Sequence, residues 1–512
     1  MRPIFFVFAA GAGLLACNGG SDTDTVSTTE PAQAMVGDNP AAVTANAVRD
    51  TIEAMRGGSR SDGSTLTLRG SNARDPGPRD TVGDAGAPLE GLNSAQAYAF
   101  QVGKEDFEEA EEPDEGLGPT FNLDGCGGCH SQPAIGGTSP KVNPQVVMLN
   151  KMVKDHHSTN KLPSFITANG PVREARFVRN ADGSPDGGVH GLFTLQGRDD
   201  ALGCNLSQPN FAAELQRNNV VFRIPTPLFG TGLIEAIPDS EIRRNQASAA
   251  SAKQAAGIRG RPNVLLTGNS ITGRPNLNGN DGTIGRFGHK AQNKSLLIFS
   301  AEAYTVEMGI TNLGFPTERD ESEGCRDLAP SPNSEATFEP EPGSPASHYP
   351  AVDGLSSIEK FTIFMRFLAP PKQSLQVKNA TPASIARGRQ LFSDVGCALC
   401  HAPSLKTYPR ASMAQMSGKT VNLFSDLLIH DMGSGLADGI QQGQASGREF
   451  RTAPLWGLGQ RLFFLHDGRT SDLRQAILEH YSDGSEANTV TRRFFELSDS
   501  QEQDVLNFLR SL

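Results

Sequence analysis

The sequence predicts a mainly α-helical, loop-rich protein made of two similar halves in tandem, with insertions in the first half. The 512 residues are enough for two to four domains of ~150 residues each, and a hydrophobic content of 37% is enough to build cores. The 55 glycines and 33 prolines favour long connections over a bundle of helices with tight turns. The tandem arrangement is predicted by a cysteine motif with flanking helices that occurs twice.

The net charge of −11 bears on the class of partner. Binding to nucleic acid depends on clustered lysines and arginines that neutralise phosphates, and this chain has no long basic run. We therefore expect no nucleic-acid partner.

The N-terminus predicts export. Arg2 precedes an apolar run over Ile4–Ala16 that is too short to span a bilayer, which is typical of a secretory signal peptide at residues 1–16. The run ends in Leu14-Leu15-Ala16-Cys17, which resembles the bacterial lipobox, in which the cysteine becomes the lipid-modified first residue. An ordinary signal peptide with a chance cysteine is the alternative. We expect a periplasmic or outer-membrane lipoprotein of a Gram-negative bacterium, attached to the membrane through lipidated Cys17.

Residues 17–92 are predicted to be the lipidated cysteine and a flexible leader. From residue 21 to about residue 91 the chain is rich in Ser, Thr, Asp, Gly and Ala and poor in large apolar residues. Such a segment buries too little apolar surface to fold by itself, and it gives a membrane anchor its reach.

Two copies of the pentapeptide Cys-x-x-Cys-His predict the chemistry of the protein. Two thiols three residues apart can bond the two vinyl-derived carbons of one haem, and the adjacent histidine then lies beneath the iron as its proximal ligand. A zinc knuckle or a redox dithiol is the alternative, but two such motifs in an exported chain favour two covalently attached haem c groups. The predicted attachment and ligand residues are Cys126, Cys129 and His130 for the first haem, and Cys397, Cys400 and His401 for the second.

Three cysteines remain outside these motifs. Cys17 is assigned to the lipid, which leaves Cys204 and Cys325 as an even pair. A disulfide is the default for such a pair in an oxidising compartment, and two unpaired thiols are the alternative.

Matching helices precede the two motifs. A helix that begins at Ser94 carries a glycine and, four residues later, a phenylalanine, and a helix that begins at Thr381 carries the same pair. In c-type cytochromes a glycine and an aromatic residue on this helix let it cross the terminal helix closely. The two pairs are Gly103 with Phe107, and Gly388 with Phe392.

Matching helices also close each half. Segments Leu355–Glu359 and Leu497–Gln501 each open with a capping box and lead into an apolar helix. Between the motif and this helix, Phe222–Gly230 resembles Phe450–Gly457. The predicted domains are an N-terminal c-type haem domain at 93–372 and a C-terminal c-type haem domain at 373–512. Insertions that would supply substrate-facing loops lengthen the first domain at 105–115, 131–188 and 245–285.

The repeat also predicts what faces each iron, and this decides between electron transfer and catalysis. Aligning Leu473 with Leu296 places His480 over Ala303. Alanine has no donor atom for iron. The second haem is therefore expected to be closed by its proximal histidine and His480, and the first haem is expected to be open.

Other side chains compete for these ligand positions. His289, which the alignment places under His466, is the main competitor for the first haem, and Met308 is another. His430 or Met432 is the alternative to His480 at the second haem.

Residues next to Ala303 form the candidate catalytic group. A carboxylate beside an open haem can move protons during O–O bond chemistry. A solvated helix face is the alternative for two carboxylates on this helix. The candidates are Glu302, Tyr304 and Glu307.

The second half resembles the bacterial di-haem cytochrome c peroxidase superfamily. There, a Phe-x-Thr-x-Pro stretch precedes a His-Asp-Gly turn and a helix that carries the sixth ligand of the second haem. In this chain these positions are 450–454, 466–468 and His480. His480 stands where the peroxidases usually carry methionine, which should lower the potential of that haem.

Three segments are more specifically similar to the di-haem oxidoreductase family of this superfamily, often labelled thiol oxidoreductase, and rubber oxygenases are distant relatives. The segments are 116–122, 286–291 and 450–458. His289 departs from the pattern, because a tryptophan is expected there in close relatives. The resemblance implies a calcium ion between the haems, held by the backbone carbonyls of Thr452 and Pro454. Arg223 and Arg451, from the two similar stretches noted above, are expected to contact the haems.

We therefore expect an exported di-haem c-type oxidoreductase of the peroxidase type. Peroxide would be reduced, or dioxygen activated, at the open first haem, and the second haem would relay electrons from a periplasmic donor such as a small c-type cytochrome. The alternatives are an oxygenase that oxidises an organic substrate and a non-enzymatic electron-transfer cytochrome. The thiol oxidoreductase label gains no support, because no cysteine remains for thiol chemistry.

Overall fold

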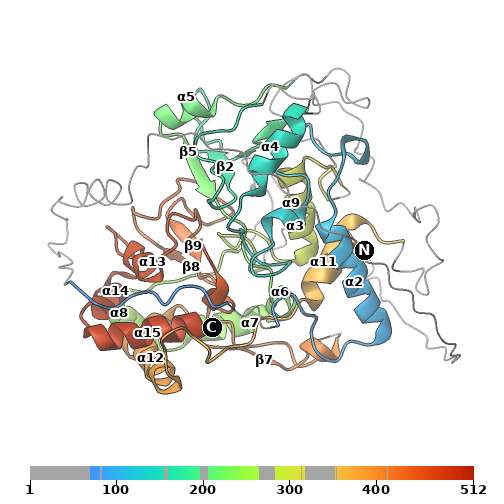
Figure 1. Cartoon of the computed structure of the whole chain (residues 1–512). Coiled ribbons are helices and arrows are strands. Elements are labelled where there is room, and N and C mark those ends of the chain that lie inside the picture. The colour runs from blue at the N-terminus through green and yellow to red at the C-terminus, as the bar shows by residue number, and fades with distance from the viewer. Residues whose placement is uncertain are drawn as a thin grey trace, which may run out of the picture. The chain divides into compact units, whose positions relative to one another are not determined.

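Helices dominate the part of the chain that the structure describes, as the sequence predicts, and the strands are short (Figure 1). The computed structural model describes residues 70–80, 84–154, 160–195, 204, 206–264, 283–312, 314–316, 352, 354–411 and 413–512. The predicted signal peptide, Cys17 and Cys325 lie outside these residues. None of the described helices is long and apolar enough to cross a membrane.

Helices occur on both sides of the predicted domain boundary at residue 373. Before residue 373 the helices are α2 (Ser94–Glu108), α3 (Cys126–Cys129), α4 (Pro144–Lys154), α5 (Phe211–Gln216), α6 (Thr231–Glu235), α7 (Asp239–Ala247), α8 (Ala250–Ala256), α9 (Leu296–Met308) and α11 (Ser357–Phe367). After it they are α12 (Pro382–Val395), α13 (Leu473–Glu479), α14 (Asn488–Phe495) and α15 (Asp499–Ser511), and the second cysteine motif opens with the 3-10 helix η4 (Cys397–Leu399).

The strands pair antiparallel in four small sheets within the described residues. These are β1 (Thr120–Phe121) with β4 (Phe193–Thr194), β2 (Glu174–Phe177) between β3 (Val189–His190) and β5 (Val220–Arg223), β6 (Leu405–Lys406) with β7 (Thr420–Val421), and β8 (Ile429–Asp431) with β9 (Glu449–Arg451). Helix α4 and strand β2 come from the predicted insertion at 131–188. Cys204 is disulfide-bonded.

Helix α2 crosses α11 at Gly103, as the sequence predicts, and Figure 1 shows the two helices side by side. A Cβ atom on Gly103 would lie 2.4 Å from the backbone oxygen of Lys360, so only glycine fits this crossing. One turn later, the ring centroids of Phe107 and Phe364 are 5.0 Å apart. The predicted capping box at the start of α11 is present.

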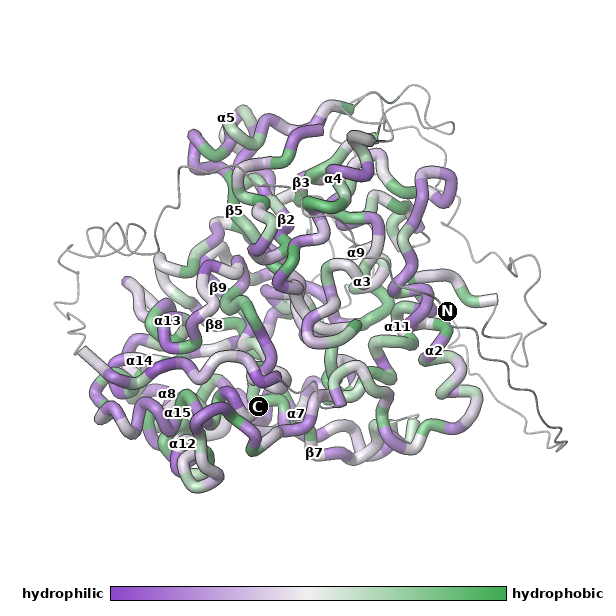
Figure 2. The backbone as a smooth tube through the Cα atoms, viewed as in Figure 1, coloured by the Kyte–Doolittle hydropathy of each residue, from purple (hydrophilic) through white to green (hydrophobic). Residues whose placement is uncertain are grey.

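Helix α12 crosses α15 in the same way in the second half. A Cβ atom on Gly388 would lie 1.8 Å from the backbone oxygen of Asp504. The rings of Phe392 and Phe508 pack 5.4 Å apart, and α15 opens with the predicted capping box. Figure 2 shows polar and apolar residues alternating along α12 and α15. Helix α12 buries one side, whereas α15 is buried all round from Asp504 to Ser511.

The turns before α9 and α13 have the same backbone, which supports the predicted alignment of the two halves. Leu296 and Leu473 are each the first residue of their helix. Each preceding turn is closed by one isolated antiparallel β-bridge. Each also places two residues in the left-handed region of backbone conformation, where φ is positive. The bridges are Phe287 with Asn293 and Phe464 with Thr470, and the left-handed residues are Gly288 and Ala291 in one turn and Leu465 and Gly468 in the other.

These two turns also tie the two halves together. The backbone N–H of Arg451, in β9, donates to the carbonyl of His289 at 2.8 Å. In return, the backbone N–H of Ile224, after β5, donates to the carbonyl of His466 at 2.8 Å. The turn of each half is therefore held by a strand end of the other half, next to the two cavities described below.

Candidate functional site

The first Cys-x-x-Cys-His motif lies beside a buried cavity. Cys126, Cys129 and His130 all line this first cavity. His130 Nδ1 donates to the Gly137 carbonyl at 3.0 Å, which leaves Nε2 with a lone pair for a metal. Burial lowers the pKa of His130 to about 4, so the ring is neutral at physiological pH.

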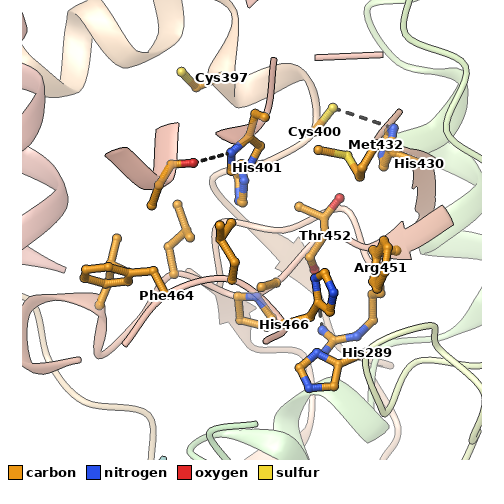
Figure 3. Close-up of a pocket in the computed structure, with 18 of the residues that line it drawn as sticks. His289, Cys397, Cys400, His401, His430, Met432, Arg451, Thr452, Phe464 and His466 are labelled. Atoms are coloured by element: carbon orange, nitrogen blue, oxygen red, sulfur yellow. Dashed lines mark hydrogen bonds between the residues drawn. The ribbon is translucent and has the colours of Figure 1, made fainter. Parts of the chain in front are cut away.

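The second motif repeats this arrangement at a second cavity. His401 Nδ1 donates to the Phe424 carbonyl at 3.0 Å, and burial lowers its pKa to about 4. Figure 3 shows His401 extending into the cavity from the side of Cys397 and Cys400. Both motif histidines are therefore held in a tautomer whose Nε2 is left to bind a metal, as the predicted iron-ligand role requires.

His480 lines the second cavity together with His401. Its Nδ1 donates to the Ala476 carbonyl at 2.8 Å, so its Nε2 also keeps a lone pair. Burial lowers the pKa of His480. The structure thus brings two neutral histidines to one cavity, as the prediction of a closed second site requires. Met432 lines the same cavity, at the Cys400 side in Figure 3.

His430 is not available as the alternative iron ligand. Its Nδ1 lies 2.9 Å from the Glu486 carboxylate and its Nε2 lies 3.1 Å from the Asp426 carboxylate. A histidine that donates from both ring nitrogens has no lone pair for a metal. The glycine-rich sequence around His430 gave no signal of these two acidic partners, one of which lies 56 residues away.

Glu302 and Glu307 lie in the wall of the first cavity, so the alternative of a solvated helix face is wrong. Glu302 is 6% exposed and accepts a hydrogen bond from Asn293 Nδ2. Burial raises the pKa of Glu302 to about 7. This carboxyl can therefore both give and take a proton near neutral pH.

Glu307 belongs to a hydrogen-bonded group of polar and charged side chains. Its carboxyl accepts from Asn122 Nδ2 at 2.9 Å and is hydrogen-bonded to Glu174 of β2. Burial, together with the charge of Glu174, raises the pKa of Glu307 well above its usual range, so Glu307 carries the proton of this pair. Arg176 forms an ion pair with Glu174. The sequence gave no sign that β2 lines this cavity.

Tyr304 lines the first cavity, but its hydroxyl has another partner. The hydroxyl donates to Glu111 Oε1 at 2.6 Å, and the side chains are 1% and 4% exposed. Burial raises the pKa of Glu111 to about 7. Glu111 comes from the acidic segment 105–115, which the sequence assigned only to an insertion.

His289 and Met308 contact the cavity edges. His289 lines both cavities, and its Nε2 donates to the Ile224 carbonyl at 3.0 Å. Met308 Sδ lies 3.9 Å from Cys126 Sγ, at the edge where the thioether bond is predicted. His466 stacks on Phe450 with ring centroids 4.3 Å apart.

The predicted arginines lie beside the cavities, and further arginines line the same walls. Arg223 lines the first cavity, although its Nη atoms already bind Asp438 at 2.7 Å and Gln442 at 2.6 Å. Arg173 lines the same cavity, and its buried Nε has no hydrogen-bond partner among the described residues. Arg451 lines the second cavity together with Arg461.

Arg451 and Arg461 are half-buried, and their guanidinium groups have no carboxylate partner in the described part of the chain. Burial lowers the pKa of each to about 10. An unpaired buried charge is costly, and the two propionate groups of a haem would supply the missing negative charge. Arg461 was not predicted from the sequence. The available signal was its position as a charged residue directly before the apolar run 462–465.

The residues at both cavities therefore fit haem, whereas the predicted calcium site does not fit its ion. The Thr452 carbonyl already accepts from Ser425 Oγ at 2.6 Å and from Arg451 Nη1 at 3.4 Å. A cation there would adjoin a guanidinium group. Pro454, the other predicted ligand, lines the second cavity. Among the described residues, no cluster of three or more His, Cys, Asp or Glu side chains is suited to a metal.

A protein-family model described as "Di-haem oxidoreductase, putative peroxidase" matches residues 174–512. The chain belongs to this family of oxidoreductases, whose members contain two haems. The match covers the second cysteine motif, β2, α9 and both turns that tie the halves together. No curated protein matches the chain.

Three solved structures are similar to parts of the chain. Hydrazine synthase of Kuenenia stuttgartiensis is 20% identical over 30% of this chain and 55% of that chain, with a TM-score of 0.20. The di-haem peroxidase BthA of Burkholderia thailandensis is 12% identical over 45% and 66%, with a TM-score of 0.26. A MauG-like protein associated with microbial copper homeostasis is 15% identical over 57% and 91%, with a TM-score of 0.25. The chain thus spans about half of the first of these and just under two thirds of the second.

Proposed function

We propose that this protein is an exported di-haem c-type peroxidase, with peroxide reduced at the first cavity and electrons entering through the second. The observation that carries the proposal is the asymmetry between equivalent positions of the two halves. His480 faces the second cavity, and Ala303, its equivalent in the shared turn-and-helix unit, lines the first cavity without a donor atom.

The residues that would hold the haems are those of the two motifs. Cys126 and Cys129 would attach the first haem, His130 would bind its iron, and Arg173 and Arg223 of the same cavity would supply positive charge for its carboxylates. Cys397 and Cys400 would attach the second haem between His401 and His480, next to Arg451 and Arg461. A bound haem supplies iron that takes peroxide or dioxygen where one axial position is open, and that carries electrons where both are filled.

Glu302 is the proton carrier in this proposal. Reduction of peroxide to water consumes protons, and the Glu302 carboxyl is buried in the cavity wall with a pKa of about 7. The amide of Asn293 holds the carboxyl in place. Glu307 is less suited to this role, because its proton is shared with Glu174 and its other contact is Asn122.

The electron donor and the membrane anchor are further parts of the proposal. A small c-type cytochrome of the periplasm would donate electrons to the second site, and lipidated Cys17 would keep the protein at the membrane. Replacing Cys17 with serine should release the protein from the membrane fraction. If the variant partitions like the natural protein, the anchor is wrong.

The function is tested by the spectrum and by single-turnover mixing. The mass of the mature protein should exceed that of the polypeptide by two haem groups, and one of the two haems should bind carbon monoxide after reduction. Mixing the reduced protein with peroxide should then oxidise both haems. A fully low-spin protein that binds neither carbon monoxide nor cyanide would be an electron-transfer cytochrome. Fast oxidation by dioxygen in place of peroxide would favour an oxygenase.

A further inference from the structure

The buried pair of Tyr304 and Glu111 is more costly than a structural hydrogen bond requires. The tyrosine hydroxyl donates to the carboxylate at 2.6 Å, and both side chains are almost fully buried. A backbone carbonyl or a neutral amide would satisfy a buried hydroxyl without the cost of burying a carboxylate. The choice of a carboxylate therefore indicates a group that can accept a proton from the phenol.

Aromatic contacts connect this pair to the proximal histidine of the first site. The ring centroid of Tyr304 lies 5.2 Å from that of Phe361, edge to face. Phe361 lies 5.9 Å from Phe107, and Phe107 lies 6.0 Å from the ring of His130. The three contacts form an unbroken series of packed rings from the tyrosine to the predicted iron ligand.

The chemistry of phenols explains why a base beside the tyrosine matters. A phenol that loses an electron becomes a strong acid, so its oxidation at moderate potential requires that the proton leave at the same time. Glu111 Oε1 lies within hydrogen-bond distance of that proton, and burial keeps water away from the oxidised ring. Tyr304 also lines the first cavity, so it adjoins the place where peroxide would react.

We propose that Tyr304 and Glu111 form a redox site that supplies one of the two electrons needed to reduce a peroxide. The O–H bond of Tyr304 breaks, the proton moves to the Glu111 carboxylate, and the electron passes to the first haem site. The second electron comes from that site itself, and the O–O bond of peroxide breaks to give water with protons from solvent. An electron that arrives later from the second site reduces the tyrosyl radical, and Glu111 returns the proton. This inference rests on the proposed function, because peroxide is the oxidant.

The test is electron paramagnetic resonance on the haem-loaded full-length protein, frozen soon after mixing with hydrogen peroxide. The natural protein should give a tyrosyl radical signal, and Tyr304→Phe and Glu111→Gln should each lose it. Tyr408 is 50% exposed and lines neither cavity, so Tyr408→Phe is the matched control and should keep the signal. Both test substitutions preserve side-chain size, and unchanged haem content and absorption spectra show that the variants are folded.

Several outcomes would overturn the inference. A radical that survives in Tyr304→Phe, or that is lost only in Trp456→Phe, would place the oxidising equivalent on another residue, since Trp456 lines the second cavity. Turnover of peroxide by the natural protein with no radical at any time would also exclude the redox site, while leaving the proposed function intact.

A second oxidant separates the two proposals if peroxide does not react at all. In that case the proposed function fails, but the pair can still be oxidised by flash-generated ruthenium(III) tris(bipyridine). The measurement is made in the Tyr408→Phe background, so that the exposed tyrosine does not contribute. Adding Tyr304→Phe or Glu111→Gln should remove a tyrosyl signal. If neither substitution changes the signal, the redox site is wrong regardless of the activity.

Discussion

The two cysteine-motif regions share a scaffold and differ in the wall that faces each proximal histidine. In both, a helix crosses a second helix at a glycine, and the proximal histidine donates Nδ1 to a backbone carbonyl at 3.0 Å. In both, a turn with two left-handed residues leads into the facing helix. That helix is followed by its C-cap His480 at the second cavity and carries Ala303 at the first. The comparison teaches that the two cavities differ at one position of a shared turn-and-helix unit, which is histidine at the second cavity and alanine at the first.

The charged side chains in the walls of the two cavities also differ. The first cavity has carboxyl groups in its wall, and Glu302 among them titrates near neutral pH. The second cavity has Arg451 and Arg461, whose charges lack carboxylate partners among the described residues. Carboxyl groups serve proton transfer, whereas unpaired guanidinium groups serve to hold the carboxylates of a bound group.

The largest expected effect comes from His480→Ala, which would remove the difference between the two regions. The variant should acquire a second haem that binds carbon monoxide, because alanine leaves the position facing His401 empty. Electron delivery to the first site should be lost. Carbon monoxide titration counts the open haems. If His480→Ala leaves the low-spin signal intact and His289→Ala removes part of it, the alignment of the two halves is wrong.

The next effect is on catalysis at the first region. Glu302→Gln removes the proton carrier but keeps the shape and one polar contact with Asn293. Peroxide turnover should fall by ~10²–10⁴-fold, and both haem spectra should stay nearly unchanged. The matched control is Glu90→Gln, because that side chain is 87% exposed and lines neither cavity. Equal activity of Glu302→Gln and the control would exclude Glu302 as the proton carrier.

A smaller effect tests the shared scaffold itself. Alanine at a helical glycine is normally stabilising, but at Gly388 its Cβ would lie 1.8 Å from the Asp504 oxygen. We expect Gly388→Ala to lower the free energy of unfolding by ~1–3 kcal/mol. Gly103→Ala should lower the free energy of unfolding by less, because its Cβ would lie farther from the nearest backbone oxygen, at 2.4 Å from that of Lys360. Thermal unfolding measures both, with Ala386→Ser on the exposed side of α12 as the control. Stabilisation by either alanine would contradict the close crossing.

The sequence predicted those parts of the fold and site that depend on local patterns. The glycine crossings and the capping boxes follow from residues close together in the chain, and the alignment of His480 with Ala303 follows from a repeated local pattern. Glu111 could not be placed in this way, because its partner at the first cavity, Tyr304, lies 193 residues away in the chain. His430 was misleading in part for the same reason, since Asp426 is four residues away but Glu486, its other carboxylate partner, is 56 residues away.

The smallest effect is the pH dependence of stability, and it also separates the two regions. Burial raises the pKa of Glu302 from its ordinary value of 4.5 to about 7, so between these values the folded state holds a proton that the unfolded state has lost. Stability therefore falls as the pH rises through this window. Between pH ~6 and ~8 the contribution of Glu302 amounts to about 1 kcal/mol, and Glu302→Gln should remove it. Calorimetry of both proteins at the two pH values measures the difference. The same slope in both proteins would mean that Glu302 is already ionised at the lower pH, and it would then not serve as a proton donor.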